Sequence, residues 1–232
     1  MTRRLILAIV LLAGLSAKPL RAAEPCRYYV LLFGGVAEKY QPRTAHTWAT
    51  FVKAGPQNAG PVALEAFTIS WLPVQLPVVP LKLIPEPGRN YGLTETLDLF
   101  NTGKQDVSMW GPFEIREDWY AGALKHKQFL DTSVQFLTLD RGPMVPYGRV
   151  RHPEISHCVH AIIRTNEALR DSCCPVLWYG EFITRKVAAQ MNRNGLLVEP
   201  RRTHDWLLAP LGVDGQPVIR RAIDEPILKF LR

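Results

Sequence analysis

The chain has 232 residues, of which 47% are hydrophobic and 21% charged, and its formal net charge is +7. This balance is too apolar and too weakly charged for an intrinsically disordered protein. Only one segment is apolar enough to enter a membrane, which excludes a polytopic membrane protein. Because no long polar linker interrupts the chain, its length favours a single domain.

The N-terminus carries that apolar run, residues 5–15, after Arg3 and Arg4 and before several small residues. This order is typical of a secretory signal peptide, because the run is short of the roughly 20 residues that cross a bilayer as a helix. We expect residues 1–23 to be a signal peptide, residues 24–232 to form the domain, and the protein to be exported to a periplasm or outside the cell. Loss of the signal would lower the formal net charge from +7 to +3.

The remaining charge gives no basis for nucleic-acid binding, which requires a clustered basic face. The densest basic residues are interrupted by acidic and apolar ones, and we interpret them as a solvated surface: Arg201, Arg202, Arg220 and Arg221. No integral membrane span is expected after signal removal. Since no P-loop or dinucleotide fingerprint is present, no cofactor is expected either.

Export would place four cysteines in an oxidising compartment, where they could form two disulfides in three connectivities: Cys26, Cys158, Cys173 and Cys174. Adjacent cysteines rarely bond to each other, because the disulfide geometry strains the peptide between them. A bridge from Cys26 to one of the adjacent pair fits this constraint.

Alternation and β-prone residues predict five strands, over residues 27–33, 46–53, 64–72, 107–115 and 133–139. The second and third of these form a predicted hairpin. Residues 73–90 are rich in proline, which excludes a regular helix or a central strand and predicts an extended surface segment or a lid. Gly111-Pro112 interrupts the fourth strand, and we interpret it as a kinked corner with core aromatic residues rather than a pocket wall.

Helical periodicity predicts a short helix over residues 94–101 and longer helices over 116–130, 156–171 and 181–194. Prolines after residue 196 predict loops and short strands. The order lacks the steady strand–helix alternation of a parallel sheet. It therefore favours an α+β fold, with one domain in which an antiparallel sheet packs against about three helices.

Reactive side chains are densest between residues 152 and 160, which include His152, His157, Cys158 and His160. In one interpretation, Cys158 is a nucleophile in the first turn of a helix, where backbone N–H groups and the helix dipole lower its pKa. Such a thiol needs a base, and His46, which opens a predicted strand, is the natural candidate, with His160 as a second imidazole close in the sequence. In the other interpretation the cluster binds Zn²⁺, but residues 157, 158 and 160 do not converge on one helix face.

The order of these motifs resembles the circularly permuted NlpC/P60 papain-like proteins, which include lecithin retinol acyltransferase-like proteins. In that group a histidine at the start of a strand precedes a cysteine in an Asn-Cys-Glu-His-Phe type motif that opens a helix. Here His46-Thr-Trp-Ala precedes His157-Cys158-Val-His160-Ala. Residues 157, 159 and 161 depart from the motif, and the polar residue that would orient His46 is either Thr68 or Ser70.

The resemblance implies a papain-like fold and a hydrolase or acyltransferase acting on an amide or ester. Cys158 would attack the carbonyl, His46 would take and return the proton, and backbone N–H groups at the helix start would stabilise the oxyanion. In an exported protein the substrate would be a small molecule, a cell-wall peptide or a lipid. The alternative is a non-catalytic exported binding or structural protein.

Overall fold

The computed structural model describes residues 25–36, 45–56, 62–76, 78, 84–137, 155–169 and 180–225. Within these ranges the chain forms one mixed domain of mostly antiparallel sheet and four α-helices. This confirms the expected mixed fold and antiparallel pairing. The expected signal peptide lies outside the described residues.

The larger sheet has the strand order β3-β2-β1-β6-β9. Its strands are β1 (Arg27–Val36), β2 (His46–Ala54), β3 (Leu64–Ile69), β6 (Asp106–Ile115) and β9 (Val218–Arg221). The predicted hairpin of β2 and β3 is confirmed, and β1 pairs antiparallel with both β2 and β6. The C-terminal strand β9 joins β6 in parallel.

The smaller sheet has the order β4-β5-β7-β8. Its strands are β4 (Trp71–Pro73), β5 (Glu86–Asn90), β7 (Gln135–Phe136) and β8 (Ile155–Ser156). The prediction that residues 73–90 contain no central strand is wrong, because β5 lies between β4 and β7. Proline cannot donate a backbone hydrogen bond, but its carbonyl can still accept one. The Pro87 carbonyl accepts the N–H of Val74 at 2.9 Å, which allows Pro87 in this inner strand.

The helices are α1 (Leu93–Thr102), α2 (Glu117–Ser133), α3 (Cys158–Ile163) and α4 (Gly180–Arg193). α2 extends to Ser133, the first residue of the strand predicted over 133–139. Within the described part of that predicted strand, only β7 is a strand. The predicted helix 156–171 is wrong in length, because β8 occupies its start and a 3₁₀ turn, η4 (Glu167–Leu169), its end. Thr165 ends α3 by donating its hydroxyl hydrogen to the Ile162 carbonyl at 2.7 Å. No helix among the described residues is long and apolar enough to span a membrane.

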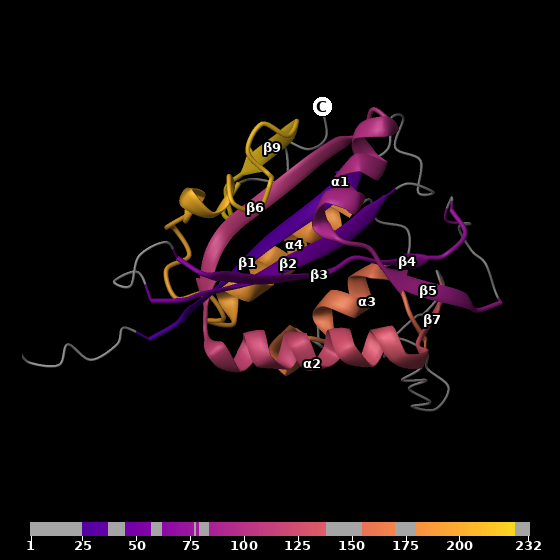
Figure 1. Ribbon diagram of the computed structural model, residues 1–232, viewed down its shortest axis with the longest axis horizontal. Helices are drawn as coiled ribbons and strands as arrows, with labels where there is room; N and C mark the ends of the chain where they lie inside the picture. Colours follow the sequence, from indigo (N-terminus) through magenta and orange to yellow (C-terminus); the bar gives the residue numbers. More distant parts are fainter. Residues whose placement is uncertain are drawn as a thin grey trace, which may run out of the picture.

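The larger sheet is buried on both faces, which explains why β1 is a nearly continuous apolar run. Val30 and Leu32 point to one face, where they pack with residues of α2, α3 and α4. Tyr29, Leu31 and Phe33 point to the other face, toward α1 and the segment around residue 207. Figure 1 shows α1 and α4 on opposite sides of the strands, with α2 running below them.

The Gly111-Pro112 interruption lies inside β6, as a kinked corner. Trp110 and Phe113 are buried on either side of it, which confirms the interpretation as core. Gly111 has a φ of 95°, and a Cβ there would meet the Val30 carbonyl oxygen at 2.8 Å. Only glycine fits this position, because both the backbone angle and the neighbouring strand exclude a side chain.

Candidate functional site

Cys158 is the first residue of α3, as the sequence predicts. His157 caps the helix, since its Nδ1 accepts the backbone N–H groups of Val159 at 3.2 Å and His160 at 3.4 Å. This explains why a histidine replaces the usual Ser, Asp or Asn at the cap position. Two of the N–H groups that we expected to stabilise an oxyanion are therefore already bonded to the cap.

The Cys158 side chain is partly exposed and packs against the core cluster on the α2, α3 and α4 face. Burial of the sulfur raises the pKa of the Cys158 thiol, and hydrogen bonds from the backbone N–H groups of Thr47, Val159 and Cys158 itself oppose this only in part. The prediction of a lowered thiol pKa is therefore wrong. A six-residue helix offers too few aligned dipoles to offset the desolvation.

The start of β2 is an open strand edge on one side. Pairing between β2 and β3 begins only at Ala49 and Ile69, whereas β1 pairs with β2 from His46 onward. The first residues of β2 therefore have no strand neighbour on the β3 side. α3, which begins at Cys158, packs on β2.

His46 is the first residue of β2, which confirms its predicted place at a strand end. Only 2% of the residue is exposed, and its ring stacks on Trp48, with centroids 5.3 Å apart, and on Phe100, at 6.1 Å. Burial lowers the pKa of His46 from 6.5 to about 3. The imidazole is therefore neutral at physiological pH, because the apolar walls disfavour its charged form.

Hydroxyl groups hold one side of the His46 ring. Its Nε2 lies 2.9 Å from Ser70 Oγ, which in turn lies 2.9 Å from Thr96 Oγ1. Of the two residues that the sequence offered for orienting His46, the structure therefore places Ser70 against the ring. Thr68 instead pairs with Thr50, with the two hydroxyl oxygens 3.0 Å apart.

The other side of the ring is unpaired. His46 Nδ1 is buried and has no hydrogen-bond partner among the described residues. The ring packs with Trp48 and Phe100 on the α1 face of the sheet, whereas Cys158 packs on the other face, and no hydrogen bond joins the two among the described residues. Catalytic hydrogen bonds are often long in a protein without substrate and shorten when substrate binds.

His160 does not join this arrangement. It is buried, with its ring centroid 3.9 Å from that of His157. Two residues along a helix turn a side chain by about 200°, so His160 points away from Cys158. His152 lies outside the described residues, and within the described part of the chain no three His, Cys, Asp or Glu side chains could hold a metal ion.

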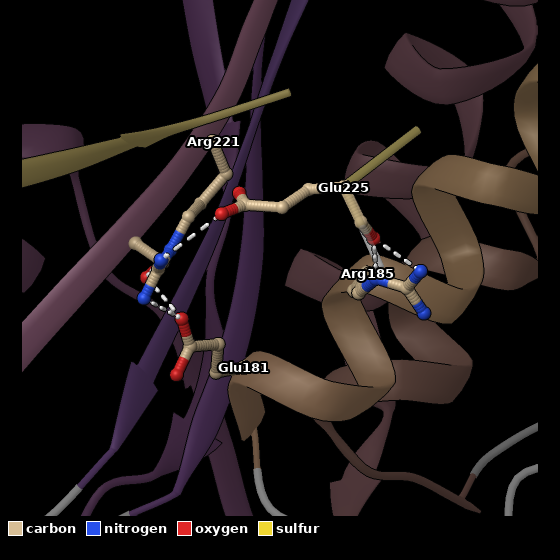
Figure 2. Close-up of polar contacts among 5 residues, drawn as sticks. Glu181, Arg185, Arg221 and Glu225 are labelled. Atoms are coloured by element: carbon tan, nitrogen blue, oxygen red, sulfur yellow. Dashed lines mark hydrogen bonds and ion pairs between the residues drawn. The ribbon is translucent and has the colours of Figure 1, made fainter. Parts of the chain in front are cut away.

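The start of α4 supports the position of His46. A Cβ on Gly180 would lie 2.6 to 2.7 Å from backbone atoms of Gly35 and His46, so only glycine allows this close approach. The adjacent Glu181 accepts a hydrogen bond from Arg221 at 2.7 Å, and Figure 2 shows Arg221 between Glu181 and Glu225. Because its side chain is only 18% exposed, the prediction that Arg221 is a solvated surface residue is wrong.

The cysteines are unpaired in the described structure. Cys26 and Cys158 both carry free thiols in the described structure, and the partners expected for a disulfide with Cys26 are not among the described residues. Cys173 and Cys174 lie outside the described residues. Cys158 is therefore available as a thiol.

Comparisons with family models, with curated proteins and with solved structures found no match to this chain. The resemblance to NlpC/P60 papain-like proteins thus stays an expectation from short motifs. The arrangement of Cys158, His46 and Ser70 has to be judged on its own chemistry.

Proposed function

We propose that the protein is a cysteine-dependent hydrolase or acyltransferase that acts on an amide or ester, with Cys158 as nucleophile and His46 as base. The observation that carries the proposal is that α3, which begins at Cys158, packs on β2, which begins at His46. The His46 imidazole is neutral at physiological pH, and its buried Nδ1 has no hydrogen-bond partner among the described residues. Because Cys158 packs on the α2, α3 and α4 face of the sheet and the His46 ring on the α1 face, the two side chains must approach each other when substrate binds.

The resting pair is uncharged, because burial raises the pKa of the thiol and lowers that of the imidazole. The sulfur attacks the substrate carbonyl carbon while the thiol proton moves to His46, and the carbonyl π electrons move to oxygen. Collapse of the adduct breaks the bond to the leaving group, which takes the proton from His46. Attack of water or a second acceptor on the thioester then releases the acyl group and regenerates the thiol.

Exposure of the two groups supports this division of roles. Cys158 is a partly exposed residue at the start of α3, whereas the imidazole of His46 is shielded from water. The Ser70 hydroxyl takes the place that an orienting third residue has in a catalytic triad. The signal-like N-terminus supports export, where the substrate would be a small molecule, a cell-wall peptide or a lipid.

Hydrolysis of p-nitrophenyl acetate tests the proposal. Cys158→Ser and His46→Gln should each lower kcat/KM by about 100-fold or more, since a positioned base contributes at least that factor. Cys26→Ser is the matched control, because it removes a thiol outside the site, and it should leave kcat/KM unchanged. Equal kcat/KM for all four proteins would instead favour the alternative of a non-catalytic exported binding or structural protein.

A further inference from the structure

The first turn of α4 lies on one row of neighbours across the larger sheet. In this row, Gly34 of β1 pairs with Ser108 of β6 on one side and with Thr47 of β2 on the other. Residues directly opposite each other in antiparallel strands point to the same face of the sheet. A Cβ on Gly34 would lie 2.8 Å from the Cα of Glu181, so the glycine at the centre of the row allows the helix to approach the sheet closely.

The β2 end of the row connects α4 to the backbone of His46. Thr47 donates its hydroxyl hydrogen to the Gly180 carbonyl at 3.2 Å, and its Oγ1 lies 2.9 Å from Thr184 Oγ1. The Gly180 backbone also lies against the backbone N and O of His46, from which a Cβ would be only 2.7 and 2.6 Å away. A shift of the start of α4 would therefore move the strand end that carries the imidazole.

The β6 end of the row is held by an ion pair. Glu181, the acidic residue in the first turn of α4, accepts hydrogen bonds from Ser108 at 2.5 Å and from Arg221 at 2.7 Å. Arg221 also donates its Nε hydrogen to Ser108 at 3.0 Å, which closes a triangle of hydrogen bonds. Since the Glu181 and Arg221 side chains are each only 18% exposed, solvent and salt screen this pair little.

Arg221 is the last residue of β9, and its guanidinium is held from two sides. Figure 2 shows it between Glu181 and Glu225, whose Oε1 lies 3.7 Å from Arg221 Nη1. Arg185, one turn further along α4, donates its Nε hydrogen to the Glu225 carbonyl at 2.7 Å. The end of β9 and the residues after it are thus bonded to two successive turns of α4.

We propose that Arg221 is a positioning residue for His46. Its pair with Glu181 holds the start of α4 on the row, and the Gly180 backbone in turn holds the start of β2. The catalytic meaning rests on the proposed function, because the His46 ring and Cys158 lie on opposite faces of the sheet and must approach each other when substrate binds. The position of the strand end then sets how closely the imidazole can approach the thiol.

NMR of the protein labelled with ¹³C-histidine tests the positioning without any substrate, with His46→Gln assigning the ring signals. The His46 ring stacks on Trp48 and Phe100, so a small movement of the ring changes its chemical shift through their ring currents. Arg221→Met should shift the His46 signal from its wild-type position. Arg221→Lys keeps a cation between the two carboxylates and should shift the signal less.

Arg220→Met is the matched control, because Arg220 lies on the same strand but pairs with the exposed Asp205. It should leave the His46 signal in place. An unchanged signal in Arg221→Met, or an equal shift in Arg220→Met, would overturn the proposal. Should Arg221→Met fail to fold, Glu181→Gln provides the second test, because it removes the charge that Arg221 binds and should also shift the His46 signal.

Kinetics with p-nitrophenyl acetate test the catalytic consequence. Arg221→Met should lower kcat by about 10- to 100-fold and leave KM unchanged, since a displacement of about 1 Å in the site can cost that factor. Because Arg221 acts through Glu181, the Glu181→Met variant and the double variant should lose the same factor as Arg221→Met. Losses that multiply in the double variant, or an unchanged kcat in Arg221→Met, would contradict the positioning role. A shifted His46 signal in a protein without esterase activity would refute the proposed function alone.

Discussion

Acid should destabilise the fold through His46 in particular. The unfolded chain binds a proton at His46 near pH 6.5, whereas the folded protein does so only near pH 3. Between these values the unfolded state holds the extra proton, so the free energy of unfolding falls as the pH falls. The contribution amounts to about 2 kcal/mol between pH 7 and pH 5 and reaches about 4 kcal/mol at pH 3.

Urea unfolding followed by far-UV circular dichroism at pH 7, 6 and 5 measures this contribution. His46→Gln keeps a polar group beside Ser70 but cannot titrate, so the wild type should lose about 2 kcal/mol more than the variant between pH 7 and pH 5. Burial also lowers the pKa of His204, but both proteins share that residue and its effect cancels. Equal losses in the two proteins would refute the buried, neutral His46.

Three further predictions follow from close packing, charge and thiol environment. Gly180→Ala should lower the free energy of unfolding by about 1–3 kcal/mol in urea titrations, because the new methyl group meets backbone. Gly92→Ala, where a Cβ meets nothing within 4 Å, should change it by less than about 0.5 kcal/mol. Arg221→Met should cost about 1–3 kcal/mol by removing the guanidinium that pairs with the carboxylates of Glu181 and Glu225, whereas Lys53→Met, at an exposed ion pair, should cost less than about 1 kcal/mol. Iodoacetamide should alkylate Cys158 at pH 7 more slowly than it alkylates N-acetylcysteine, because burial raises the thiol pKa; faster alkylation would contradict that direction.

Local patterns were sufficient to predict most of the fold. The alternation in residues 46–53 and 64–72 identified a hairpin, because one-sided packing imposes a period of two on each strand. Residues 86–90 could not be recognised as strand β5, since proline suppresses the period of two. Which backbone groups of this segment form hydrogen bonds depends on its neighbours β4 and β7, and the local sequence does not show these partners. The helix at residue 158 was correctly placed but overextended, because Thr165 ends it through a hydrogen bond that its periodicity does not reveal.

The candidate site was predictable in part. Cys158 at a helix start and His46 at a strand start follow from local signals, and Ser70 was one of two candidates for the residue that orients His46. Thr96 carried no signal, because its contact with Ser70 depends on how α1 packs against the sheet. The direction of the thiol pKa was predicted wrongly, since position in a helix can be read from sequence whereas burial of the sulfur cannot.

Trapping of an acyl-enzyme tests the central claim most directly. The protein would be mixed with p-nitrophenyl acetate, quenched in acid within seconds, and mapped by peptide mass spectrometry. We predict one acetyl group on Cys158 in the wild type, none on the Cys158→Ser protein, and formation at least about 100-fold slower in His46→Gln. Acetylation spread over Cys26 and surface lysines, or an unchanged rate in His46→Gln, would contradict Cys158 and His46 as the catalytic pair.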